Sequence, residues 1–229
     1  MLGLVHYNPS LGHQVRYARA FEQAGFKITT EVDGKADVHV VLGPWYAMKH
    51  LQDHPRVLMI DRAYWGDPDS VSIGWLQPDG SRAFATGTYQ RPHPKPLPWK
   101  EREQSALLLA DYGQDISEAY AEAKLRFHFV RVRKHPADDP SQVPLRTHLA
   151  LCDVAIGWKS TALVEAALYG VPVVCLNDQG VTRPVAAHSI EADLYRGSRA
   201  EWLHNLSYRQ FTIDEIADGT AWRHLKTAI

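Results

Sequence analysis

Short apolar runs alternate with helical patterns from the start of the chain. The run at residues 2–7 predicts a buried strand, and the spacing of Val15, Ala18 and Phe21, closed by Gly25, predicts the helix that follows. Further strands are predicted at residues 26–32, 37–43 and 56–61, with a short helix at 45–52. Strands interleaved with helices indicate a mainly parallel sheet that is covered on both faces.

The same alternation restarts after a proline-dense stretch. Residues 89–100 hold four prolines in twelve positions, which stiffen the chain and remove backbone donors. This stretch predicts a linker at residues 93–103, and a long surface loop is the alternative. Strands are then predicted at 105–113, 127–136, 153–158 and 171–177, with helices at 116–125, 143–152 and 160–170. The pattern predicts an α/β fold with two Rossmann-like domains, at residues 1–92 and 104–198, and two helical segments at 199–229.

Composition narrows the class of protein. Apolar residues make up 45% and charged residues 22% of 229 residues, and the net charge is −1. These values exclude global disorder, and they disfavour strong nonspecific binding to nucleic acid. Cys152 and Cys175 form no CxxC motif, which favours a reducing compartment. No signal-peptide pattern and no apolar run of about 18 residues are present, so we expect a cytoplasmic protein without a membrane span.

The first candidate site lies at the start of the helix at 160–170. Ser160 or Thr161 can cap this helix, and the free amides and dipole at a helix start attract anions. Lys159 adds positive charge there. Glu165 shares a helix face with Thr161 at the i, i+4 spacing, from which its carboxylate could accept the hydroxyls of a ribose. The alternative is an ordinary capping arrangement without a ligand.

A second candidate site follows the strand at 127–136. His135 stands before a proline at the carboxyl end of this strand, where α/β sheets bind ligands. Arg133 and Lys134 add positive charge beside it. Gly113, in the loop after the preceding strand, would let the backbone approach a ligand closely. The alternative for His135 is an exposed histidine in a turn.

These motifs resemble the nucleotide-sugar domain of GT-B glycosyltransferases, with His-Pro and Ser/Thr motifs similar to those of bacterial sialyl and capsule-type transferases. The resemblance covers about residues 104–178. It implies that His135 and either Ser160 or Thr161 hold phosphate and that Glu165 holds the ribose. It also implies an acceptor domain in the first half, a cleft between the domains, and C-terminal helices that pack back on the first domain.

Glycosyl transfer by inversion requires a base for the acceptor hydroxyl, and two residues are candidates. Asp61 ends a predicted strand and is followed by Arg62, Tyr64 and Trp65, whose side chains could bind an acceptor. His13, in a Gly-His loop, is the rival base. Asp61 could instead pair with Arg62 or cap a turn, and His13 could cap a helix.

The sequence therefore predicts a glycosyltransferase that uses a nucleotide-sugar donor. We expect it to act without a metal cofactor, because no metal-binding cluster is evident in the sequence and the "DPD" at 67–69 is only weak evidence for a metal site. The acceptor would be a glycan, a small molecule or a modified DNA base, as in bacteriophage DNA glycosyltransferases. The alternatives are an enzyme similar to nucleotide-sugar epimerases and a nucleotide-sugar-binding protein without catalysis.

Overall fold

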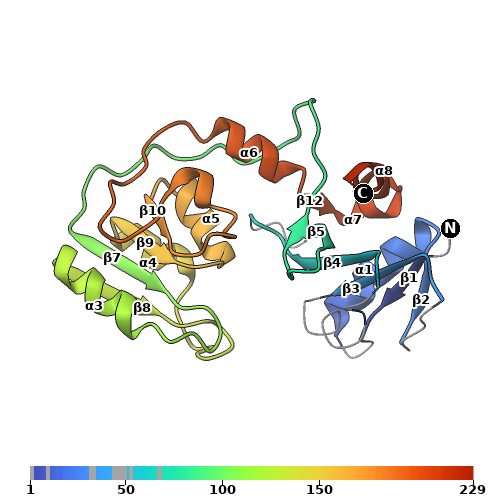
Figure 1. Cartoon of the computed structure of the whole chain (residues 1–229), viewed down its shortest axis with the longest axis horizontal. Helices are drawn as coiled ribbons and strands as arrows, with labels where there is room; N and C mark the ends of the chain where they lie inside the picture. The colour runs from blue at the N-terminus through green and yellow to red at the C-terminus, as the bar shows by residue number, and fades with distance from the viewer. Residues whose placement is uncertain are drawn as a thin grey trace. The chain divides into compact units, whose positions relative to one another are not determined.

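The chain forms two compact units in a computed structural model (Figure 1). The model describes residues 3–8, 11–30, 35–42, 51, 54–65 and 69–228. One unit comprises Met1–Pro92 with His204–Ile229, and the other comprises His93–Leu203. Each unit has its own sheet, so the fold is mixed α/β. The helix predicted at 45–52 lies outside the described residues, apart from residue 51.

The sheet of the first unit is parallel in one part and antiparallel in the other. Its strands, in the described residues, are β1 (Gly3–His6), β2 (Lys27–Thr29), β3 (Val38–Leu42), β4 (Val57–Arg62), β5 (Ser70–Leu76), β6 (Arg82–Ala83) and β12 (Gln210–Thr212). The order is β12-β5-β4-β3-β1-β2, and β6 pairs with β5. Strands β1 to β4 pair in parallel, whereas β5 pairs antiparallel with β4, β6 and β12.

The prediction of a mainly parallel sheet is therefore wrong beyond β4. Only residues 63–69 connect β4 to β5, and a parallel connection needs a crossover of a dozen or more residues. The C-terminal prediction of two helical segments also missed β12. This strand comes between α6 (Ala200–Ser207) and α7 (Ile213–Ala217), and α8 (Thr220–Leu225) and η2 (Lys226–Ala228) follow.

The C-terminal segment packs into the core of the first unit. Phe211, Ile216 and Leu225 share a buried cluster with Val5 and with Phe21 of α1 (Gly12–Gln23). The indole N–H of Trp75 donates a hydrogen bond to the carbonyl oxygen of Leu225 (2.8 Å). The C-terminal segment thus packs in the same core as β1 and α1.

The sheet of the second unit is parallel throughout the described strands. Its elements are β7 (Ser105–Leu109), α3 (Ser117–Arg126), β8 (Phe129–Arg133), α4 (Leu145–Leu151), β9 (Val154–Gly157), α5 (Thr161–Leu168), β10 (Val173–Cys175), η1 (Arg183–Val185) and β11 (Ala186–Ala187). The order is β11-β10-β9-β7-β8. The helices and strands predicted between residues 105 and 177 are confirmed. Each of them corresponds to a local stretch of sequence with a single hydrophobic periodicity.

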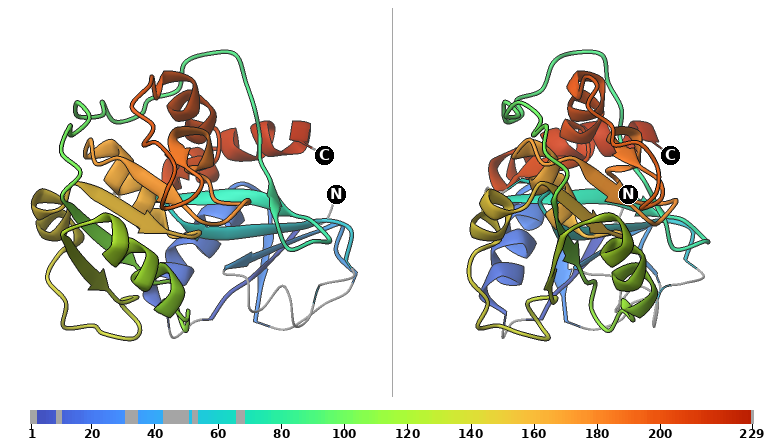
Figure 2. Two further views of the ribbon diagram at one scale, coloured as in Figure 1. Left: turned by 60° about the vertical axis from the view of Figure 1, so that its left-hand side comes forward. Right: turned by 90° about the vertical axis from the view of Figure 1, so that its left-hand side faces the viewer.

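Helix α3 covers one face of this sheet, while α4 and α5 cover the other (Figure 2). Val130 and Val132 of β8 pack in one cluster with Ala119 and Ala123 of α3. Because successive side chains of a strand point to opposite faces, Phe129, Arg131 and Arg133 point toward the α4 side. This alternation places the basic side chains of β8 on one face.

The proline-rich segment is hydrogen-bonded to elements of the second unit. The amide of Leu97 donates to the carbonyl of Leu168 (2.9 Å), and the amide of Lys100 donates to that of Gly170 (2.6 Å). The ammonium group of Lys100 donates to the carbonyls of Leu149 (2.8 Å) and Cys152 (2.5 Å) at the C-terminus of α4. A cation there satisfies carbonyls that lack helical partners.

Gly170→Ala is expected to destabilise the protein by about 3 kcal/mol. Gly170 has φ +75°, which costs other residues about 1–2 kcal/mol, and a Cβ atom there would clash with the backbone oxygen of Pro98. Urea unfolding followed by tryptophan fluorescence measures the change. Gly113→Ala is the matched control, because Gly113 has φ +64° but open space around it, so it should lose only about 1 kcal/mol. Equal losses in the two variants would contradict the packing argument.

Candidate functional site

The loops that follow three strands of the second unit are hydrogen-bonded to one another at the carboxyl edge of its sheet. The strands are parallel, so their carboxyl ends meet at this edge, where open α/β sheets bind ligands. The amide of Lys159, after β9, donates to Oδ2 of Asp111, after β7 (3.1 Å). The Nζ of Lys159 donates to Oε1 of Gln179, after β10 (2.8 Å). Lys159 therefore connects the three loops instead of extending freely toward a phosphate.

Helix α5 begins at this edge. Ser160 is its N-cap, and the Ser160 Oγ accepts a hydrogen bond from the amide of Ala162 (3.2 Å). The capping role that the sequence left open is confirmed for Ser160. Thr161 is the first helical residue and is half-buried. Its hydroxyl and the positive end of the helix dipole are suited to an anion.

Glu165 lies one turn further along α5, on the face that Thr161 shares. The residue is solvent exposed, while partial burial of its carboxyl group raises the pKa and the positive charge of Arg133 acts in the opposite direction. Arg133 itself donates from Nη1 to the carbonyl of Val143 (2.7 Å). In its ionised form, the carboxylate of Glu165 can accept hydroxyl groups.

His135 is half-buried in the turn after β8. Its Nδ1 accepts a hydrogen bond from the amide of Ala137 (3.2 Å), so the neutral ring carries its proton on Nε2. The ring of Tyr112, after β7, lies edge-on to it, with centroids 5.8 Å apart. The turn thus orients a donor, Nε2–H, that can bind an anion. Lys134 is exposed beside it, and its carbonyl accepts from Nε2 of Gln142 (3.0 Å).

Three residues at this edge were not predicted from the sequence: Asp111, Tyr112 and Gln179. Asp111 and Tyr112 immediately precede the candidate residue Gly113, and Gln179 follows β10. A common signal marks all three, since each is a polar or aromatic residue soon after a predicted parallel strand. Gly113 keeps the left-handed backbone that suits a turn close to a ligand.

The two candidate bases line one cavity in the first unit. The cavity has a volume of about 370 Å³ and is lined by His13, Gln14, Tyr17, Leu42, Ile60, Asp61, Arg62 and Val71. His13 comes from the first turn of α1, and Asp61 and Arg62 come from the carboxyl end of β4. The sequence alone did not predict that these separate segments share a cavity.

Asp61 is held by two groups and remains accessible. Its Oδ1 accepts a hydrogen bond from the amide of Arg62 (2.7 Å), and its Oδ2 lies 4.0 Å from Nη2 of Arg82. The Asp61 side chain is 45% exposed. Pairing with Arg62 therefore involves the backbone amide, and the second oxygen stays available to a ligand's hydroxyl group.

Tyr64 and Trp65 do not join this cavity. Tyr64 is 1% exposed, so its ring is not available to stack on an acceptor, and burial raises its pKa. Its amide donates to Oε1 of Gln210 on β12 (2.7 Å), a contact between segments 146 residues apart. Trp65 lines a separate cavity of about 180 Å³ with Arg91 and Glu215. The burial of Tyr64 does not fit the acceptor role that the sequence predicts for its ring.

The described residues show neither a metal-binding cluster nor a membrane-spanning helix. In the part of the chain that the structure describes, no three His, Cys, Asp or Glu side chains group together as a metal site. Asp67 and Pro68 of the "DPD" stretch lie outside that part. Among the described helices, none combines the length and the apolar character that crossing a bilayer requires.

Comparison with known proteins shows a shared fold. No family model and no curated protein matches the sequence. Among solved structures, the chain is similar to Thermosulfurimonas dismutans KpsC, a beta Kdo 2,7 transferase, with a TM-score of 0.56. The match covers 97% of this chain and 99% of that chain, at 12% identity. The chain therefore has a glycosyltransferase-like α/β fold.

Proposed function

We propose that this protein transfers a sugar from a nucleotide-activated donor to a hydroxyl acceptor. The observation that carries the proposal is the grouping, at the carboxyl edge of one parallel sheet, of the His135 turn and the start of α5. It occurs in a chain whose fold resembles a glycosyltransferase along nearly its whole length. Fold alone does not define an activity, so the proposal rests on these residues.

In the proposed site, each side chain or amide group binds one part of the nucleotide. The Nε2–H of His135 and the amides and hydroxyl at Thr161 bind phosphate, with Lys134 adding charge. Glu165 accepts the ribose hydroxyls. Donors fixed before the reaction stabilise the charge that develops on the departing phosphate, which lowers the barrier to transfer. Lys159 contributes by positioning the loops.

The acceptor hydroxyl binds in the cavity of the first unit, where Asp61 removes its proton. His13 is the rival base in the same cavity. The acceptor classes remain a glycan, a small molecule or a modified DNA base. Because the similar solved structure is named as a Kdo transferase, Kdo joins the donor sugars to be tested. We place the reaction in the cytoplasm and without a metal cofactor.

A thermal-shift screen of nucleoside monophosphate and diphosphate sugars tests the proposal. One donor is expected to raise the melting temperature, since a ligand at about 100 times its Kd stabilises the folded state by about 2.7 kcal/mol. The nucleoside without phosphate is the control and should shift the melting temperature less. If no nucleotide sugar shifts it, the proposal fails. Binding without product would favour the binding protein, and an altered donor without an acceptor would favour the epimerase.

A further inference from the structure

Another cavity lies in the second unit, at the amino ends of its strands and therefore opposite the carboxyl edge that holds the proposed nucleotide site. It has a volume of about 490 Å³. Its wall includes Ser105, Phe129 and Asp153, which stand at the amino ends of β7, β8 and β9. His135, Thr161 and Glu165 do not line it. The cavity is therefore separate from the proposed nucleotide site.

Positive charge dominates the lining of this cavity. Arg102, Lys124 and Arg131 all line it, and among the described residues none of the three makes an ion pair. Asp153 is the acid in the lining, and its Oδ2 accepts hydrogen bonds from the Gln104 amide (3.1 Å) and from the Ser105 amide (3.0 Å) and hydroxyl (2.9 Å). Since Asp153 makes no ion pair with these cations among the described residues, the three cations remain available to an external anion.

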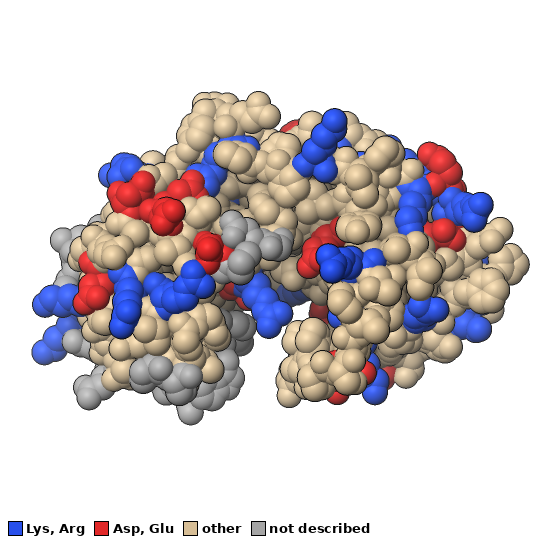
Figure 3. All heavy atoms as spheres, turned by 180° about the vertical axis from the view of Figure 1, so that it is seen from behind, with Lys and Arg blue, Asp and Glu red and all other residues tan. Residues whose placement is uncertain are grey.

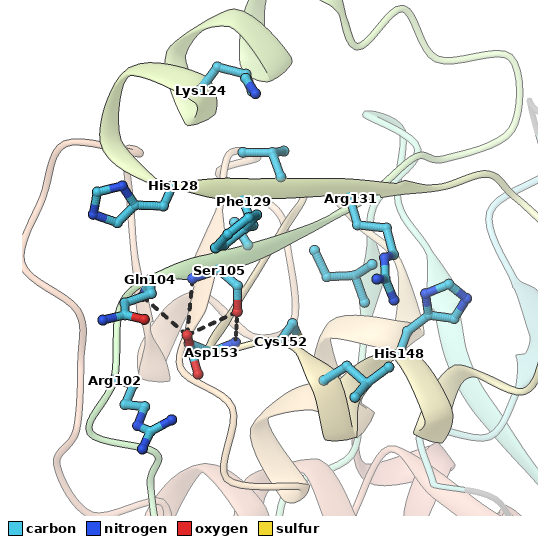
Figure 4. Close-up of a pocket in the computed structure, with 14 residues that line it drawn as sticks. Arg102, Gln104, Ser105, Lys124, His128, Phe129, Arg131, His148, Cys152 and Asp153 are labelled. Carbon is cyan, nitrogen blue, oxygen red and sulfur yellow. Dashed lines mark hydrogen bonds between the residues drawn. The ribbon is translucent and has the colours of Figure 1, made fainter.

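An exposed aromatic ring contributes to the lining of this cavity. Phe129 is 71% exposed, and its side chain points toward the α4 side. Figure 4 shows its ring on the same side of β8 as Arg131, with Arg102 across from the ring, whereas Lys124 lies beyond β8, on α3. An exposed ring of this kind offers an apolar platform for the face of a sugar, while the surrounding polar groups bind its substituents.

We propose that this cavity binds an acidic oligosaccharide whose sugar units carry carboxylates. The planar guanidinium groups of Arg102 and Arg131 match a carboxylate in a two-bond geometry. Arg102 and Arg131 lie on the side of β8 that carries the ring and Lys124 lies on the other side, which suits single charges spaced along a chain better than one phosphate. This binding does not require the proposed transfer reaction.

The charge of the whole molecule favours a saccharide over nucleic acid. The net charge is −1, and Figure 3 shows basic and acidic side chains interspersed on the visible face. Nucleic-acid affinity rests on many phosphate contacts along an extended basic surface. A local basic cavity with one ring instead matches a short segment of an acidic glycan.

His148 offers a reporter inside the cavity. Figure 4 shows it next to the guanidinium group of Arg131. Burial first, and then the charges of Arg133 and Arg131, lower its pKa. A bound carboxylate would offset these positive charges, so the pKa of His148 should rise when the ligand binds. Cys152, also in the lining, has a pKa raised by burial to about 11 and stays a thiol.

Calorimetry with hexagalacturonate, without any nucleotide, tests the inference. The full chain should bind this hexamer and should not bind neutral maltohexaose. The double variant Lys124→Gln/Arg131→Gln should weaken binding about five- to 100-fold, because two charge-assisted contacts are lost. Phe129→Ser should weaken it as well without removing charge. NMR titration of His148 should show its pKa rising with hexagalacturonate.

The matched control is Lys95→Gln/Arg146→Gln, which removes two exposed cations of the same unit outside the cavity. Its affinity for hexagalacturonate should match that of the unchanged chain. Equal weakening in both double variants, an unmoved His148 pKa, or no binding would overturn the inference. Tighter binding of the oligonucleotide dT6 would overturn it in favour of nucleic acid. None of these results depends on a donor, so they leave the proposed transfer to its own test.

Discussion

Asp61→Asn is expected to remove most sugar transfer and leave the affinity for the nucleotide donor unchanged. A positioned general base contributes about 100- to 10,000-fold to the rate, because proton removal matters only in the transition state. Asparagine keeps an oxygen that can accept the hydrogen bond from the Arg62 amide, so the end of β4 should not change. Single-turnover transfer at saturating donor measures the loss.

His13→Ala is the matched control, because His13 lines the same cavity from α1. If Asp61 is the base, His13→Ala should retain most of the single-turnover rate. A collapse in His13→Ala with full activity in Asp61→Asn would assign the base to His13. Full activity in both variants would mean that neither side chain is the base, as in a retaining mechanism.

His135→Ala and Glu165→Ala should each weaken nucleotide binding about five- to 150-fold. Each removes a polar contact to the ligand, which costs about 1–3 kcal/mol. Both side chains lie at the surface of the second unit, so the melting temperature should change little. Calorimetry with the nucleotide identified by thermal shift measures both affinities.

Glu118→Ala is the control for the glutamate. Glu118 is also exposed in a helix, but it lies on α3, which covers the other face of the sheet. Its nucleotide affinity should equal that of the unchanged chain. Unchanged affinity in both His135→Ala and Glu165→Ala would reject the nucleotide site at this edge, while leaving the inferred glycan cavity untouched.

The two halves of the chain differ in how far their sequence predicts the fold. In the second unit, each strand and helix is a local run of one period, and the connections are long enough for right-handed parallel crossovers. The candidate residues there follow the ends of β8 and β9, so His135, Thr161 and Glu165 could be proposed from sequence position alone. Asp111 and Gln179 also follow predicted strands, but their hydrogen bonds to Lys159 are seen only in the folded structure.

The sequence by itself determined the α/β class, the parallel second sheet and a cap of α5 by Ser160 or Thr161, because local periodicity and capping depend on neighbouring residues. Tertiary structure alone decided three other features: the pairing of β12 with β5, the burial of Tyr64, and the presence of His13 and Asp61 in one cavity. Each depends on contacts between residues far apart in the chain. A local sequence pattern does not indicate which distant residues will be in contact, so these three features are evident only in the folded molecule.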